Sequence, residues 1–172
     1  MEEMVVLVDQ DDAQVGTAPK SRVHRTGERH RAVSVFLFDE QGRLLLQQRA
    51  AQKYHSPGLW SNTCCGHPRP GETPVNAARR RLREEMGIEC ELAHALTFEY
   101  RAPVGELIEH EVDHVFTGRF SGTPSPDADE VGDWSWRELD EVVEDARANP
   151  LRYSAWLPIA LERLRLGEKP GS

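Results

Sequence analysis

One segment of the chain, residues 66–88, joins a loop rich in glycine and proline to a strongly charged helix. Thr73 is a good N-cap residue, Pro74 suits the first helical position, and Gly87 suits the helix end. Between these limits, apolar side chains recur at helical spacing at Val75, Ala78, Leu82 and Met86. The spacing therefore predicts an amphipathic helix over residues 73–86, with one face packed on the rest of the molecule.

The remaining pattern is that of an α/β (α+β) fold. Two apolar runs flank a four-residue turn that ends in Gly42, which predicts a β-hairpin. Periodicity predicts further strands at 5–9, 95–101 and 112–120, and helices at 139–149 and 154–167. A chain of 172 residues fits one domain, 1–172, so we expect a core over about 5–165 and a flexible tail at 167–172.

Composition and charge exclude several classes of protein. The formal net charge is −8 and no basic stripe is present, so nucleic acid is not the expected partner. Three cysteines, two of them adjacent, do not make a disulfide framework, which favours a reducing, cytoplasmic location. The short apolar run near the N-terminus is neither a signal peptide nor a membrane span. We expect a cytoplasmic monomer that acts on a small molecule.

The segment LIEHEVDHVF alternates and indicates a strand with Glu109, Glu111 and Asp113 on one face. Two carboxylates two residues apart, about 6–7 Å along a strand, can converge on one ion. Three histidines elsewhere could add imidazole ligands: His24, His30 and His67. Such a set suits Mn²⁺, Zn²⁺ or Fe²⁺. From the residues alone, however, His24 and His30 are interpreted as solvated loop histidines.

From Gly66 the sequence reads GHPRPGETPVNAARRRLREEMGI, and its spacing resembles the Nudix box. In that loop–helix–loop motif, helix carboxylates bind a divalent metal beside a diphosphate. Nudix hydrolases have glutamate where this chain has Arg81. This difference, together with the motifs CGHP, EHEV and SAWLP, makes the chain similar to the type I isopentenyl-diphosphate isomerases. The resemblance covers residues 5 to 160, approximately. It implies a Nudix-like fold of mixed and antiparallel sheets flanked by helices.

The resemblance also implies a reaction and the residues that carry it. The reaction is the interconversion of isopentenyl and dimethylallyl diphosphate by protonation and deprotonation, which needs no organic cofactor. The implied catalytic residues are Cys65, Glu111, Tyr100 and Trp156. One divalent ion would be bound by His24, His30, His67, Glu109 and Glu111. Mg²⁺ would arrive with the diphosphate and bind Glu85 and the carbonyl of Cys65, and the substrate-binding cations would be Lys20, Arg49, Lys53 and Arg81.

Adjacent cysteines in an extended chain point to opposite sides, so only one can face a pocket. Cys65 precedes GHP, as in the family, and Cys64 is expected to be a buried apolar residue.

Two other functions share features of this sequence. A Nudix hydrolase acting on a nucleoside diphosphate derivative would share the loop–helix–loop, but Arg81 and the CGHP turn argue against it. A zinc-binding scaffold with Cys64, Cys65 and His67 as ligands lacks a second cysteine pair at zinc-site spacing.

Overall fold

Strand β3 (His30–Phe38) is the centre of the fold in the computed structural model, which describes residues 2–167. One edge of β3 pairs in parallel with β8 (Leu107–Arg119) over the whole length of β3. Three strands follow one another along its other edge: β1 (Met4–Val8), β6 (Cys64–Gly66) and β4 (Leu44–Arg49). Residues on both faces of β3 are also buried, which explains its nearly continuous apolar sequence.

The other four strands extend this arrangement into a mixed sheet of nine strands. Strand β2 (Gln14–Pro19) pairs antiparallel with β1. On the other side of β3, β7 (Ala93–Val104) pairs antiparallel with β8. Strand β4 in turn pairs with both β5 (Trp60–Ser61) and β9 (Val131–Arg137). The expected mixed sheet is confirmed, and β7 and β8 are both longer than the sequence pattern predicted.

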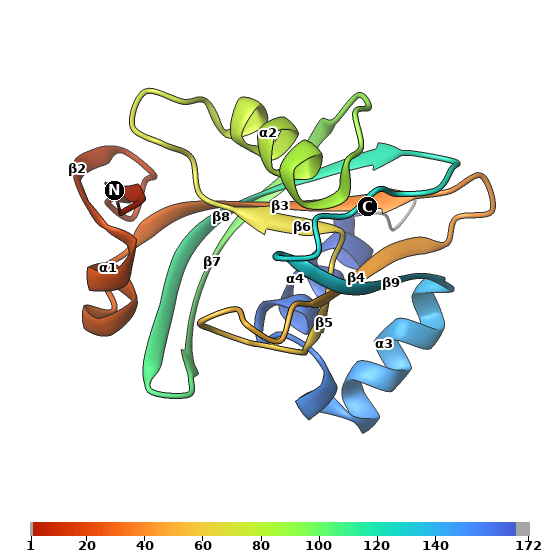
Figure 1. Cartoon of the computed structure of the whole chain (residues 1–172). Helices are drawn as coiled ribbons and strands as arrows, with labels where there is room; N and C mark the ends of the chain where they lie inside the picture. The colour runs from red at the N-terminus through yellow and green to blue at the C-terminus, as the bar shows by residue number, and fades with distance from the viewer. Residues whose placement is uncertain (1, 168–172) are drawn as a thin grey trace.

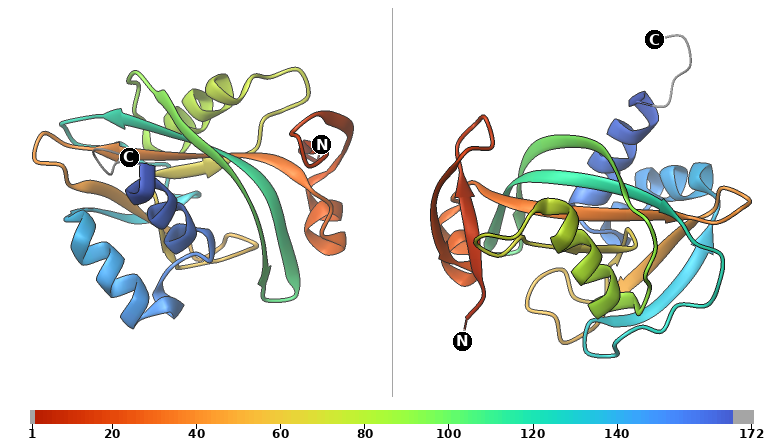
Figure 2. Two further views of the ribbon diagram at one scale, coloured as in Figure 1. Left: turned by 180° about the vertical axis from the view of Figure 1, so that it is seen from behind. Right: turned by 90° about the horizontal axis from the view of Figure 1, so that it is seen from above.

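Helices cover the two faces of the sheet. Helix α2 (Pro74–Met86) lies on one face, and α3 (Leu139–Ala148) and α4 (Trp156–Gly167) lie on the other (Figures 1 and 2). Alternate residues of β3 follow this division, because Val35 packs with α2 whereas Phe36 packs with α3 and α4. A short helix α1 (Lys20–Thr26) lies beside the β1–β2 hairpin, and a 3₁₀ turn, η1 (Pro150–Arg152), precedes α4.

Helix α2 begins and ends as its sequence predicts. The hydroxyl of Thr73 accepts a hydrogen bond from the backbone N–H of Asn76 at 3.3 Å. Gly87 adopts the left-handed conformation, φ 64°, and its N–H donates to the carbonyl of Arg83. The buried face differs in part from the expected one, since Val75 is half-buried and Glu85 is buried. A buried carboxylate on this face is the first structural sign of a site.

The predicted hairpin is present, but its strands pair at one position only. Gly42, with φ 78°, closes the turn, and Phe38 pairs with Leu44. Beyond that pair the strands separate, because β6 takes the neighbouring edge of β3. Between residues 2 and 167, no helix is long and apolar enough to span a membrane.

Several short elements carry no periodic signal and were not predicted, including α1, β5 and β6. Each has two to seven residues and is held by its neighbours, which a local pattern cannot reveal. The interpretation of His24 and His30 as solvated loop residues is wrong. His24 lies on α1 and His30 begins β3, and both are fully buried. Of the expected tail, Gly167 ends α4 and residues 168–172 lie outside the described range.

Candidate active site

The predicted site residues converge on one pocket. Eleven of them line it: Lys20, Arg49, Lys53, Cys65, His67, Arg81, Glu85, Tyr100, Glu109, Glu111 and Trp156. The remaining two, His24 and His30, lie behind the pocket in the buried cluster with His67 and Glu111. Residues from almost the whole length of the chain therefore meet at one place, which the sequence alone could not establish.

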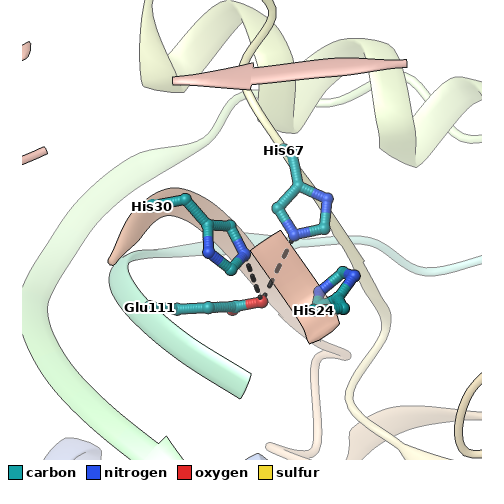
Figure 3. A group of neighbouring side chains, drawn as sticks. All are labelled: His24, His30, His67 and Glu111. Carbon is teal, nitrogen blue, oxygen red and sulfur yellow. Dashed lines mark hydrogen bonds and ion pairs between the residues drawn. The ribbon is translucent and has the colours of Figure 1, made fainter. Parts of the chain in front are cut away.

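Three histidines surround the carboxylate of Glu111 (Figure 3). Glu111 Oε1 lies 3.4 Å from Nε2 of His30 and 3.2 Å from Nε2 of His67. His30 faces Glu111 because β3 and β8 run parallel with these two residues in register. Gly27, with φ 77°, ends α1 one turn after His24 and returns the chain toward β3. Together, His24, His30, His67 and Glu111 bring four ligand atoms within 4.8 Å of one another.

Glu109 lies beside this cluster. Its Oε1 is 3.5 Å from Nε2 of His24 and 3.2 Å from Nε2 of His55. His55 was not predicted as a site residue. It is the single histidine of the loop segment KYHSPG, and one histidine without a repeating spacing gives no signal of a ligand. His24, His55 and Glu109 form a second group of three ligand atoms that shares His24 with the first.

The donor set fits a divalent transition ion. Among residues 2–167, the Nε2 atoms of His24 and His30 and Oε2 of Glu109 are buried and have no hydrogen-bond partner. Burial lowers the pKa of His67 well below its ordinary value, which keeps that imidazole neutral, as a ligand must be. The backbone carbonyl of Glu28 lies 3.0 Å from Nδ1 of His30, which directs Nε2 into the cluster.

The two glutamates of β8 differ in their pKa. Burial and the charge of Glu111 raise the pKa of Glu109. Burial would also raise the pKa of Glu111, but the polar neighbours Glu109 and His30 outweigh it and hold the pKa at about 2. The hydroxyl of Tyr100 donates to Oε2 of Glu111 at 3.1 Å, while burial keeps the pKa of Tyr100 well above its usual range. Glu111 is thus an ionised carboxylate that contacts both the histidines and a protonated phenol.

Cys65 faces the pocket from β6, as expected, whereas Cys64 packs under α2. Two polar groups contact the sulfur of Cys65: the hydroxyl of Ser34 at 3.6 Å and Oδ1 of Asn62 at 3.2 Å. Oδ1 of Asn62 also accepts from the indole Nε1 of Trp156 at 3.0 Å. Burial raises the pKa of the Cys65 thiol to about 12. The sequence pattern missed Ser34 and Asn62, although Asn62 stands in the same SNTCC segment as the cysteines.

Cations gather at one end of the pocket, and acidic residues pair with them. Lys20 lies 3.6 Å from Glu3, and Lys53 contacts Glu130. Burial lowers the pKa of Lys20, which is consistent with its enclosed position. These acidic partners had no signal in the sequence, since isolated glutamates are common on protein surfaces.

Arg81 and Arg49 complete the cationic end. Arg81 Nη2 donates to Glu85 at 2.6 Å, and its Nε donates to the carbonyl of Cys65 at 3.3 Å. Both groups expected to hold Mg²⁺ therefore already contact one guanidinium. The guanidinium of Arg49 lies over the ring of Trp156, 5.5 Å from its centre. The pocket thus has a cationic end, an aromatic wall, and acid–base groups on Cys65 and Glu111.

Comparison with known proteins agrees with this geometry. The NUDIX domain matches residues 28–157. "Isopentenyl-diphosphate Delta-isomerase 2" of Aromatoleum aromaticum is 55% identical over 165 residues, which cover 95% of this chain and 87% of that protein. The chain belongs to the isopentenyl-diphosphate Delta-isomerase family. Another member, from Serratia proteamaculans, is 49% identical over 98% of this chain and 94% of its own length.

Solved structures confirm the Nudix fold. The Deinococcus radiodurans protein DR0079 superposes with a TM-score of 0.80 at 21% identity, covering 94% of this chain and 99% of that one. A MutT NUDIX hydrolase from Burkholderia pseudomallei superposes with a TM-score of 0.64 at 23% identity, covering 80% and 98%. The fold is common to hydrolases, whereas the sequence relatives are isomerases, so the resemblance stated from the motifs is confirmed.

Proposed function

We propose that this family member interconverts isopentenyl and dimethylallyl diphosphate, with Cys65 and Glu111 as the two proton-transferring groups. The supporting observation is that the thiol of Cys65 and the carboxylate of Glu111 line the same pocket, whose cationic end suits a diphosphate. In this reaction a proton is added to the terminal methylene carbon and another is lost from the carbon next to the diphosphate-bearing one. One C–H bond forms at the methylene carbon, one C–H bond breaks at the other carbon, and the double bond moves between them, so the reaction is balanced without a further reactant.

The two groups differ in a way that suits this chemistry. Cys65 is a thiol at neutral pH, because burial raises its pKa, and a thiol lies against a hydrocarbon at little desolvation cost. Glu111 is ionised and receives a hydrogen bond from the phenol of Tyr100. Protonation of the alkene produces positive charge at the tertiary carbon, and the indole of Trp156 would stabilise that charge. The hydrogen bond from Trp156 Nε1 to Asn62 fixes the orientation of the indole ring.

The cations would bind the diphosphate by exchanging their acidic partners for phosphate oxygens. Lys20 and Lys53 each contact a glutamate, which the trianionic substrate would displace. Arg49 and Arg81 would add planar guanidinium donors. Mg²⁺, carried by the diphosphate, would bind near Glu85 and the Cys65 carbonyl. A second ion, Mn²⁺, Zn²⁺ or Fe²⁺, held by His24, His30, His67, Glu109 and Glu111, would supply positive charge that keeps Glu111 ionised and oriented.

Proton NMR in D₂O tests the proposal. Purified protein is incubated with isopentenyl diphosphate and Mg²⁺, and Cys65→Ser and Cys90→Ser are treated in parallel. We expect deuterated dimethylallyl diphosphate from the wild type and from Cys90→Ser, and no turnover by Cys65→Ser. Release of inorganic phosphate or of a monophosphate would overturn the isomerase and support the hydrolase instead.

A further inference from the structure

The loop between β4 and β5 holds a fourth histidine against the buried cluster. Only 8% of His55 is exposed. Its backbone carbonyl accepts hydrogen bonds from Arg49 Nε at 3.4 Å and Nη2 at 3.3 Å. The next residue, Ser56, has φ 50°, a conformation that a non-glycine residue adopts only where its surroundings impose it. The loop therefore has one defined conformation, which directs the ring of His55 inward.

The distance between Nε2 of His55 and Oε1 of Glu109 is compatible with two ligands of one ion. Two donors that bind one ion at about 2.1 Å, with an angle of 90–110°, lie about 3.0–3.4 Å apart. The pairs His30–Glu111 and His67–Glu111 have separations of 3.4 and 3.2 Å. The Nε2 of His55 lies 3.2 Å from Oε1 of Glu109, which equals the distance between His67 and Glu111. Within residues 2–167, Glu109 is the single polar contact of the His55 ring, since its Nδ1 has none.

The two groups of ligand atoms have one residue in common. One group is His24, His30, His67 and Glu111, and the other is His24, His55 and Glu109. Each contains His24, whose Nε2 lies 3.5 Å from Glu109. An imidazole nitrogen binds one ion at a time, and Nδ1 of His24 is engaged by the hydroxyl of Tyr54. Since Nε2 of His24 cannot bind two ions, both groups can be used only around a single ion, and side-chain movements would be needed to bring all six ligand atoms together.

We propose that His55 is a sixth ligand of this ion, completing an octahedral set of four imidazoles and two carboxylates. The inference rests on the metal site of the proposed function and adds a ligand that the family resemblance did not imply. Six protein ligands fill an octahedral ion and leave no open position for water, unlike the open sites of hydrolytic metals. The ion then orients Glu111 without activating a water molecule, which accounts for isomerisation on a fold shared with hydrolases.

Mn²⁺ is the probe, because it reports both its ligands and its bound water. Pulsed EPR of the Mn²⁺-loaded protein counts the imidazole nitrogens, and proton relaxation of the solvent reports water on the ion. We expect four imidazoles and low relaxivity in the wild type. His55→Ala should show three imidazoles, higher relaxivity and an Mn²⁺ affinity reduced at least about tenfold. His94→Ala, a histidine on β7 outside the site, serves as the matched control and should behave as wild type.

A second variant separates a ligand from a residue that only positions Glu109. The amide of His55→Gln can still donate to Glu109 but supplies no imidazole. If His55 is a ligand, His55→Gln shows three imidazoles and raised relaxivity, as His55→Ala does. Three imidazoles in the wild type, or relaxivity unchanged in both variants, would overturn the inference.

His24→Ala separates the role of His55 from the existence of the metal site. Weaker Mn²⁺ binding by His24→Ala, with no effect of either His55 variant, would remove His55 alone and leave the metal site intact. If His24→Ala also bound Mn²⁺ as wild type does, the metal site, and with it the metal's part in the proposed function, would fail.

Discussion

A methyl group built on Gly66 would lie 2.4 Å from Cγ and 2.9 Å from Cδ of Arg81, too close for any real Cβ. The arginine side chain crosses β6 at this glycine, and its guanidinium then reaches the Cys65 carbonyl and Glu85. Glycine in the CGHP motif thus serves the close approach of a cation to the backbone. The arginine that distinguishes this chain from Nudix hydrolases and the glycine beside the cysteine are parts of one arrangement.

Gly66→Ala should therefore displace Arg81 and weaken binding of the diphosphate. We expect the KM for isopentenyl diphosphate to rise about tenfold, with a loss of about 1–3 kcal/mol in the free energy of unfolding from overpacking. Steady-state kinetics and urea denaturation measure the two effects. Gly132→Ala is the matched control, because its nearest neighbouring atom would lie 3.7 Å from the new methyl group. Equal KM values for the two variants would contradict the role given to Gly66.

Restoring the hydrolase residue at position 81 should make stability depend on Mg²⁺. Arg81 contacts Glu84 at 2.9 Å, Glu85 at 2.6 Å and Glu130 at 3.4 Å. Arg81→Glu would add a fourth carboxylate and take the cation from Glu85, while Arg80 and Lys53 would still pair with Glu84 and Glu130. Breaking a largely buried ion pair costs about 3–5 kcal/mol. We expect the Tm of Arg81→Glu in EDTA to fall below that of Arg81→Gln, and millimolar Mg²⁺ to raise it. A Tm insensitive to Mg²⁺ in both variants would count against a cation site at Glu85.

Local signals in the sequence predicted the elements that local interactions determine. Helix α2 begins after Thr73 and ends before Gly87 as expected, because capping depends on residues within one turn. The alternation around Glu109 and Glu111 gave the buried face of β8 correctly, since strand periodicity is exact. The opposite orientations of adjacent cysteines follow from the same periodicity.

Contacts between distant segments could not be predicted in this way. His24 and His30 are buried because they pack against each other, His67 and the glutamates of β8, which no local pattern shows. The family resemblance implied a role for them as metal ligands but not their geometry. His55 is a lone histidine in a loop, and its place beside Glu109 depends on how Arg49 and Ser56 hold that loop. Glu130 likewise meets Lys53 only through the folded sheet.

The two adjacent cysteines should separate stability from activity. Cys64 is buried in the apolar cluster under α2. Cys64→Ser would bury a hydroxyl among apolar side chains and lower the free energy of unfolding by about 1–3 kcal/mol. Its isomerase activity at a temperature well below Tm should remain within about threefold of wild type. Cys65→Ser should show the reverse, with a small change in unfolding free energy and no measurable turnover. Denaturation and NMR turnover on both proteins test this, and activity lost equally in both would refute the assignment.

The thiol of Cys65 should react as a thiol of high pKa. Burial, followed by the negative charge of Asp113, raises the pKa of Cys65 to about 12, so the thiolate fraction is very small at neutral pH. In a Cys64→Ala, Cys90→Ser background, we expect alkylation by iodoacetamide to be slow at pH 8 and to accelerate only above about pH 10.

The same shift has a defined effect on stability. The folded protein keeps a proton that the unfolded chain loses near the ordinary thiol pKa, so this contribution to stability is complete below that value. It declines as the pH rises toward 12. Asp113→Asn removes the second cause and should move the alkylation profile to lower pH. Mass spectrometry measures the extent of alkylation at each pH. A midpoint near the ordinary thiol pKa in the Cys64→Ala, Cys90→Ser protein would show that Cys65 is not held in its protonated form.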